Sequence, residues 1–144
     1  MLIWKTPISI ASLAQRSANT AITHLGIEFL EVGDDFITAR LPVNRQTCQP
    51  MGLLHGGVSV VLAETLGSIG AAHCCPAGSH VVGLDINANH LRAVREGWVT
   101  GRAVPVHIGR TTQVWHIDIS DDSGKLCCVS RLTMAVIAGA TKTG

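Results

Sequence analysis

The longest apolar segment of the chain predicts one long helix. It runs from His55 to about Cys75, and we expect it to end before Pro76 because proline cannot continue a helix. Glu64 is the only Asp, Glu, Lys or Arg within it. Removing a carboxylate from water is costly unless its charge is paired or hydrogen-bonded. The pattern therefore predicts that Glu64 is either satisfied by a partner or used in chemistry.

Alternating apolar and polar residues predict strands on both sides of this helix. Two strands precede it, at 25–32 and 36–43, and a short helix at 9–16 begins with Ser9 as its N-cap. The strands that follow are expected at 81–91, 97–108, 111–120 and 126–137. A single helix can cover only one face of such a sheet. We therefore predict an α+β fold, with one long central helix against an antiparallel sheet of about six strands.

Length and composition restrict the kind of protein further. At 144 residues the chain is predicted to form one domain, over 1–138, with a frayed tail at 139–144. Hydrophobic residues make up 47% and charged residues only 15%, so we expect an oligomer to cover a large face. The formal net charge of +1 argues against nucleic acid as a partner.

Membrane, metal and redox functions are disfavoured as well. No uninterrupted apolar run is long enough for a bilayer, and the apolar part of the N-terminus is too short for a signal peptide. These features predict no membrane partner and a cytoplasmic location. The five cysteines show no C-x-x-C spacing and the seven histidines no ligand spacing, so we predict neither a metal site nor a redox dithiol.

One motif is similar to a known family. Pro50, Gly52, His55-Gly56-Gly57 and then Ala63-Glu64-Thr65 resemble the hotdog-fold acyl-CoA thioesterases, in the branch of the Arthrobacter 4-hydroxybenzoyl-CoA thioesterase with a glutamate on the helix. Within this branch, the chain is most similar to menaquinone-pathway 1,4-dihydroxy-2-naphthoyl-CoA thioesterases and to the proofreading thioesterase of enterobactin synthesis. The likeness also rests on Ile3-Trp4-Lys5, Gln49-Pro50, Val81-Val82-Gly83-Leu84, Asn87-Ala88-Asn89-His90, Arg95-Glu96-Gly97, His107-Ile108-Gly109-Arg110, Gln113-Val114-Trp115 and Cys127-Cys128.

The resemblance implies hydrolysis of an aryl- or acyl-CoA thioester to a free acid and coenzyme A, with no cofactor beyond the CoA of the substrate. It implies that Glu64 is the nucleophile or a general base on water. The Gly56 N–H, at the positive end of the helix dipole, would stabilise charge on the carbonyl oxygen. Gln49 would orient the thioester, Ser68 would contact Glu64 or the attacking water, and His55 would shape the carbonyl pocket.

Each of these side chains also has a purely structural interpretation. Glu64 could be satisfied by a hydrogen bond between helices. Ser68 could be a small packing residue, His55 could serve only to begin the helix, and Gln49 could bond to its own loop. The sequence leaves these alternatives open.

The distance between the two main groups predicts an oligomeric site. Gly56 and Glu64 are eight residues apart, or about 12 Å along a helix. One carbonyl cannot touch both, because reacting groups lie about 3 Å apart. A two-fold dimer with antiparallel helices would place Glu64 of one copy beside Gly56 of the other. We therefore predict a homodimer with composite sites, and the branch suggests a dimer of dimers, that is, a homotetramer.

The substrate handle is predicted from a local excess of positive charge. Residues 86–113 contain four arginines and one acid, and guanidinium groups suit the phosphates of CoA. Gly83 would line the pantetheine arm. The other CoA candidates are His90, Leu91, Arg92, His107, Gly109, Arg110 and Thr111, which could equally be solvated strand ends. A dry acyl pocket would contain Met51, Leu54, Val60, Val61 and Ile69, which could also be plain core.

Two other functions remain as rivals. A dehydratase acting on hydroxyacyl carrier proteins is disfavoured, because that chemistry places a histidine and an acid together, whereas His55 lies at the helix start. A catalytically silent acyl-CoA binding protein would differ by releasing no thiol. The sequence also leaves open whether the acyl group arrives on CoA or on a carrier protein.

Overall fold

The computed structural model describes residues 1–139, so nearly all of the expected tail at 139–144 lies outside the described residues. Two short helices, α1 (Ile10–Ser17) and α2 (Ala21–His24), come first. Strands β1 (Glu28–Val32) and β2 (Ile37–Pro42) lead to the long helix α3 (Gly56–Cys74). Four strands follow: β3 (His80–His90), β4 (Trp98–Ile108), β5 (Thr112–Asp121) and β6 (Leu126–Ile137).

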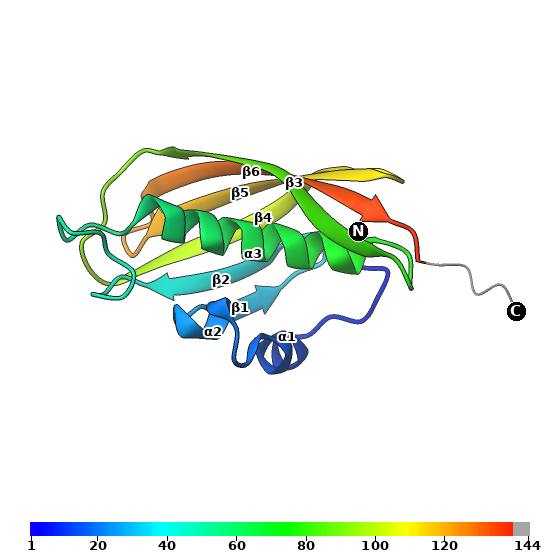
Figure 1. Cartoon of the computed structure of the whole chain (residues 1–144), viewed down its shortest axis with the longest axis horizontal. Helices are drawn as coiled ribbons and strands as arrows, with labels where there is room; N and C mark the ends of the chain where they lie inside the picture. Colours follow the sequence, from blue (N-terminus) through cyan, green and yellow to red (C-terminus); the bar gives the residue numbers. More distant parts are fainter. Residues whose placement is uncertain (140–144) are drawn as a thin grey trace, which may run out of the picture.

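The six strands form a single antiparallel sheet in the order β1-β2-β4-β5-β6-β3. The sheet curves around α3, which lies along its concave face (Figure 1). This confirms the predicted α+β architecture, with one long helix and six strands. The order also leaves β1 and β3 as the two edges of the sheet.

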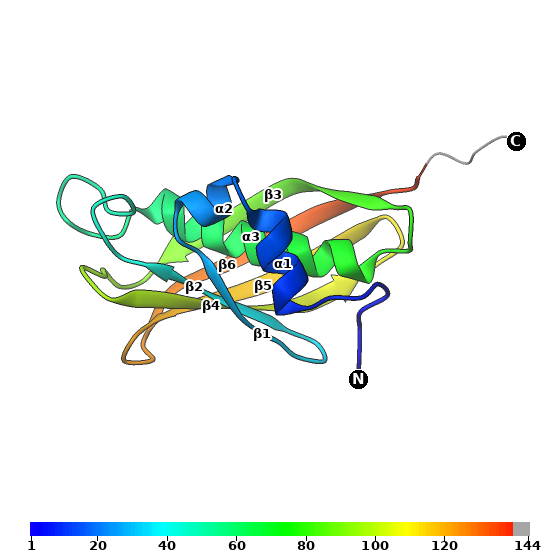
Figure 2. The same ribbon diagram turned by 90° about the horizontal axis from the view of Figure 1, so that it is seen from below.

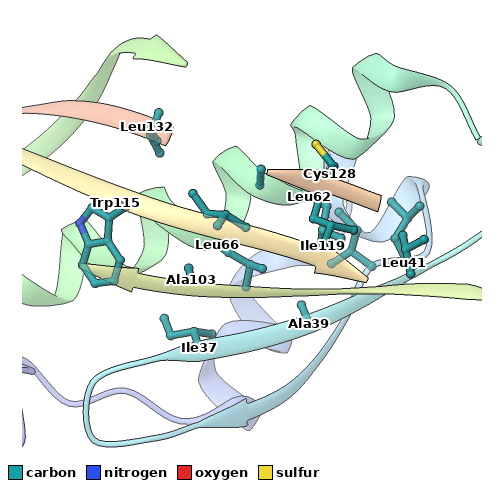
Figure 3. Packing of buried hydrophobic residues seen from close by; sticks show 14 of the residues in the cluster. Ile37, Ala39, Leu41, Leu62, Leu66, Ala103, Trp115, Ile119, Cys128 and Leu132 are labelled. Atoms are coloured by element: carbon teal, nitrogen blue, oxygen red, sulfur yellow. The ribbon is translucent and has the colours of Figure 1, made fainter. Parts of the chain in front are cut away.

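The core lies between α3 and the inner face of the sheet. Leu62 and Leu66 of α3 are fully buried and face strand residues that alternate with outward-pointing ones (Figure 3). On β5, Trp115, Ile117 and Ile119 all point inward, as the two-residue period of a strand requires. Burying large apolar side chains contributes roughly 1.5–3 kcal/mol each, so this layer supplies most of the stability.

A buried amide joins α3 to the sheet. Gln113 is fully buried; its Nε2 donates to the Ala71 carbonyl at 3.2 Å, and its Oε1 accepts from Trp115 Nε1 at 2.9 Å. Both ends of the side chain are therefore satisfied, as a buried amide needs. The bond to Ala71 fixes the C-terminal half of α3 over β5.

The N-terminal segment of the chain packs against the core and is hydrogen-bonded to the C-terminal end of α3. The Trp4 ring stacks on Trp115, with centroids 6.4 Å apart, and its Nε1 donates to the Gly33 carbonyl at 2.8 Å. Thr6 Oγ1 lies 2.8 Å from His73 Nδ1. The predicted N-cap of α1 is confirmed, because the Ser9 side chain accepts from the Ser12 N–H.

Two features were not predicted from the sequence. The single turn α2, capped by Thr20, was not foreseen. In addition, the length and mean hydropathy of α3 meet the criterion for a membrane-spanning helix. The sequence did not indicate this, because polar residues interrupt every apolar run within the segment. Half of that segment is buried against the sheet, which is how a core helix behaves.

Candidate active site

A constrained loop, residues 43–55, positions the N-terminal end of α3. Thr47 is buried; its hydroxyl donates to the Pro42 carbonyl at 2.7 Å, and its own carbonyl accepts from the His55 N–H at 2.9 Å. Cys48 and Leu54 form an isolated bridge across the loop. These bonds hold Gln49 and Gly56 in fixed positions relative to each other.

His55 and Gln49 both make local hydrogen bonds. His55 is the N-cap of α3, and its Nδ1 accepts from the Gly57 N–H at 2.8 Å. Gln49 Oε1 accepts from the Met51 N–H. The structural interpretations of these two residues therefore hold in the single chain. Both still lie at the mouth of α3, where a helix N-terminus favours developing negative charge.

Gly56 opens onto a pocket at this helix end. A Cβ on Gly56 would lie 2.8 Å from His90 Nε2, so the His90 ring would have to move if a larger residue stood here. The pocket has a volume of about 360 Å³. Its walls include the predicted residues Gln49, Leu54, Gly56, His90, Leu91 and Arg92.

Glu64 lies on a different pocket, midway along α3. This second pocket has a volume of about 410 Å³ and is mostly apolar, with Ile22, Val60, Val61, Thr65, Ser68 and Ile69 around the acid. Among residues 1–139, Glu64 has no ion-pair or hydrogen-bond partner. A half-buried carboxylate without a partner stands out, because a carboxylate removed from water is normally paired or hydrogen-bonded.

The backbone of Gly83 lies beside this acid. A Cβ placed on Gly83 would be 3.6 Å from Glu64 Oε2. Gly83 belongs to β3, so the acid lies close to a strand that forms one edge of the sheet. In a single chain, Gly83 is thus next to the acid rather than next to the other CoA candidates.

Ser68 shares the Glu64 pocket but does not contact the acid. Its Oγ lies 3.8 Å from Met134 Sδ, a weak contact. Of the two predicted contacts of Ser68, a hydrogen bond to Glu64 is not made within one chain, and the contact with the attacking water stays a prediction. The hydroxyl still lines the pocket one turn after Glu64.

The two pockets have no lining residue in common. Gly56 and Glu64 are eight residues apart on one helix, about 12 Å along its axis. A single chain therefore presents an anion-stabilising helix end in one place and the acid in another.

The predicted CoA-binding residues divide into two groups. His90, Leu91 and Arg92 join the Gly56 pocket. His107, Gly109, Arg110 and Thr111 lie in or beside the β4–β5 hairpin, at the opposite end of the sheet (Figure 1). Thr112 and Val82 both pair with Ala135, and Val82 is eight residues from His90, about 26 Å along a strand. One chain does not bring the two groups together.

The predicted acyl-pocket residues are likewise distributed over both pockets. Val60, Val61 and Ile69 surround Glu64, Leu54 lines the Gly56 pocket, and Met51 is exposed on the loop. The sequence did not indicate Ile22, because it belongs to the unpredicted turn α2. The one feature of the sequence that could have pointed to Ile22 is that it is an isolated large apolar residue in a largely polar stretch.

Cys127 is the one thiol in the walls of the Gly56 pocket. Burial, followed by the nearby Asp121 charge, raises the pKa of this thiol above its ordinary value. It therefore stays protonated at neutral pH and is a poor nucleophile. Glu64 therefore stays the candidate for the reactive group.

Comparison with known proteins identifies the family of this chain. The Thioesterase superfamily model matches residues 51–128. The chain is 48% identical to the 1,4-dihydroxy-2-naphthoyl-CoA hydrolase of Escherichia coli, covering 94% of this chain and 100% of that protein. It is 47% identical to the proofreading thioesterase EntH of Cronobacter turicensis, covering 94% and 99%.

A solved structure shows the same fold. A thioesterase from Haemophilus influenzae superposes with a TM-score of 0.95 at 52% identity, over 99% of this chain and 100% of that one. The matched family region includes the Gly56 helix start, Glu64 and Gly83. The chain thus belongs to the thioesterase superfamily, with its hotdog fold, and is a thioester hydrolase of the acyl-CoA thioesterase type.

Proposed function

We propose that the protein hydrolyses aromatic acyl-CoA thioesters, with 1,4-dihydroxy-2-naphthoyl-CoA as the favoured substrate. The observation that carries this proposal is the unpartnered Glu64 carboxylate in an apolar pocket. The naphthoyl specificity is supported by the 48% identity to the E. coli hydrolase. Water adds across the C–S bond, so the products are the free acid and the CoA thiol.

In this proposal two copies of the chain build each site. Glu64 of one copy attacks the carbonyl, or takes a proton from water that attacks it. The Gly56 N–H of the other copy donates to the oxyanion, helped by the α3 dipole. The CoA thiolate then leaves and is protonated. In the route where Glu64 itself attacks, water then hydrolyses the acyl–Glu64 anhydride, which releases the free acid and restores the carboxylate. The separation of about 12 Å between the two groups in one chain supports this arrangement.

The exposed edge of the sheet supports a dimer as well. β3 is eleven residues long, and its Val82 and Leu84 side chains are 42% and 61% exposed. An unpaired edge strand with exposed apolar side chains is a site for pairing with another chain. Gly83 lies between these two residues, beside Glu64. Pairing along β3 would therefore bring a second copy close to the acid. It would also bring the CoA candidates at the end of β3 in one copy nearer to those in the β4–β5 hairpin of the other.

Substitution of the acid tests the chemistry. Glu64→Gln should lower kcat by roughly 10²–10⁴-fold, the usual contribution of a positioned base, while the protein still folds. Release of the CoA thiol, followed with a colorimetric thiol reagent, measures this loss. Glu31→Gln, on the exposed face of β1, is the matched control and should keep full activity. Full-speed hydrolysis by Glu64→Gln would contradict the proposal.

Mixing two inactive variants tests the composite site. A Glu64→Ala chain and a Gly56→Val chain should each be inactive as homodimers. Mixed dimers contain one intact site, so co-refolding equal amounts should restore a fraction of the wild-type rate. Activity no higher than that of either parent would contradict shared sites.

A second substrate class is supported by the likeness to EntH. The same Glu64 chemistry would release misloaded aryl groups from a carrier protein. Comparing kcat/KM for benzoyl-CoA and for the same benzoyl group on an aryl carrier protein separates the two. A catalytically silent binding protein would bind benzoyl-CoA and release no thiol.

A further inference from the structure

The Glu64 pocket continues along α3 towards the C-terminal end of the helix. A neighbouring hollow of about 320 Å³ shares Ile22, Ser68 and Ile69 with it. The wall residues on α3 are Val60, Val61, Glu64, Thr65, Ser68, Ile69, Ala72 and His73. They recur every three or four positions and so occupy one face of the helix. We call this continuous depression the acyl groove.

Helices α1 and α2 form the other side of the acyl groove. Leu13, Arg16 and Ser17 of α1 and Ile22 of α2 line it. Figure 2 shows α1 and α2 lying in front of α3 in this region. The groove therefore runs from the pocket around Glu64 to the last turn of α1.

The charged groups of the acyl groove lie in different parts of it. Glu64 lines only the first pocket, and Arg16 and His73 line only the second. Arg16 makes no ion pair within residues 1–139. The walls between them are apolar or carry hydroxyl groups, with Ile69 and Ala72 as examples.

The far end carries a single positive charge rather than two. Burial, and next the Arg16 charge, hold the pKa of His73 below its usual value of 6.5. The His73 ring is fixed by Thr6, whose Oγ1 lies 2.8 Å from Nδ1. At neutral pH the far end therefore presents one guanidinium beside a neutral imidazole.

We propose that the acyl groove takes acyl groups with a carboxylate at the end remote from the thioester, and that Arg16 pairs with this carboxylate. The proposal rests on the proposed chemistry at Glu64 and extends it to ω-carboxyacyl-CoA substrates. Guanidinium groups pair with carboxylates through two parallel hydrogen bonds. Water adds across the C–S bond, giving a dicarboxylic acid and the CoA thiol.

The groove also sets the length of the acyl chain. Glu64 and Ala72 are eight residues apart, about 12 Å along α3. A short dicarboxylic chain would hold its carboxylate near Glu64, where like charges repel. A longer chain carries the carboxylate to Arg16. The preference for a carboxylate over a methyl end should therefore grow with chain length.

The experiment compares matched pairs of CoA thioesters. Adipoyl-, suberoyl- and sebacoyl-CoA are measured against hexanoyl-, octanoyl- and decanoyl-CoA, and the ratio of kcat/KM is taken at each length. The ratio should rise along the series. Arg16 is exposed, so in Arg16→Met the ratio for sebacoyl-CoA should fall by roughly two- to fivefold, the loss of one solvent-screened ion pair, and Arg16→Lys should retain part of it.

Arg131→Met is the matched control, because Arg131 is exposed on the opposite face of the sheet. It should keep the wild-type ratio at every length. A flat ratio in the wild type, or equal losses for both substrates in Arg16→Met, would overturn the proposal. Methyl-ended and benzoyl-CoA substrates would then still be cleaved. If the wild type cleaves none of these thioesters, the proposed function itself fails.

Discussion

His73 shows how a single buried side chain can make stability depend on pH. Its side chain is buried at the end of α3, and burial together with the Arg16 charge lowers the pKa of the folded state below 6.5. In the unfolded chain the imidazole takes up a proton at its ordinary pKa. The unfolded state therefore binds more protons at acid pH, and stability falls as the pH drops.

We expect the free energy of unfolding to decline below about pH 6.5, the unfolded pKa, and the decline to level off once the pH passes the lowered folded pKa. His73→Gln should make this decline shallower, since it removes the titrating group. Urea unfolding at a series of pH values measures the slope. His80→Gln changes an exposed histidine and should keep the wild-type slope. An unchanged slope in His73→Gln would show that other groups cause the acid sensitivity.

Individual site residues were predictable to different degrees. Glu64 and Gly56 were recognisable because a lone acid in an apolar helix and a glycine at a helix start are visible locally. The position of Gly83 beside Glu64 was not, because a contact between a helix and a strand depends on tertiary packing. The same holds for Ser68, whose hydroxyl points to Met134 on a distant strand.

At the scale of elements, the approach of α3 to the sheet depends on small residues. A Cβ on Gly70 would lie 2.6 Å from Trp115 Cη2, so α3 and β5 pack too closely for a larger side chain.

The strict two-residue alternation of β5 was enough to predict the strand. The four-residue α2 was not predictable, because one turn has no periodicity to detect.

Gly70→Ala should destabilise the protein although alanine favours helix. The gain in helix propensity is about 1 kcal/mol, whereas overpacking a core costs typically about 1–3 kcal/mol. We therefore expect a net loss of up to about 2 kcal/mol in the free energy of unfolding, measured by urea denaturation. Thr65→Ala, on the open face of α3, is the control and should be neutral or slightly stabilising. Stabilisation by Gly70→Ala would mean that Trp115 can move away.

The whole molecule has two sheet edges with different expected roles. β1 is short, with five residues, and α1 packs next to it, whereas β3 has eleven residues and exposed apolar side chains. Long apolar edges are those that pair with other chains. The sequence indicated an oligomer through its low charged fraction, but it could not say which edge was free, because strand order is a property of the assembled sheet.

Leu84→Lys should weaken the proposed dimer and lower activity in parallel, since a charge at the β3 edge opposes its burial. Light scattering coupled to size-exclusion chromatography measures the mass, and thiol release measures activity. Leu30→Lys provides a matched control on β1, because Leu30 is 46% exposed on the other edge. It should keep the wild-type mass and rate. A Leu84→Lys protein that is monomeric yet fully active would contradict composite sites.

The stacked indoles of Trp4 and Trp115 also give the molecule a built-in spectroscopic probe. The chain contains three tryptophans and no tyrosine, so few chromophores contribute in the near ultraviolet. The two rings, with centroids 6.4 Å apart, are close enough for their electronic transitions to couple, whereas Trp98 lies apart beneath the Arg40 guanidinium. Detachment of the N-terminal segment that carries Trp4 would abolish the circular-dichroism band that arises from coupling of Trp4 with Trp115. The environment of Trp98 would not change. Loosening of the N-terminal segment can therefore be observed separately from melting of the sheet.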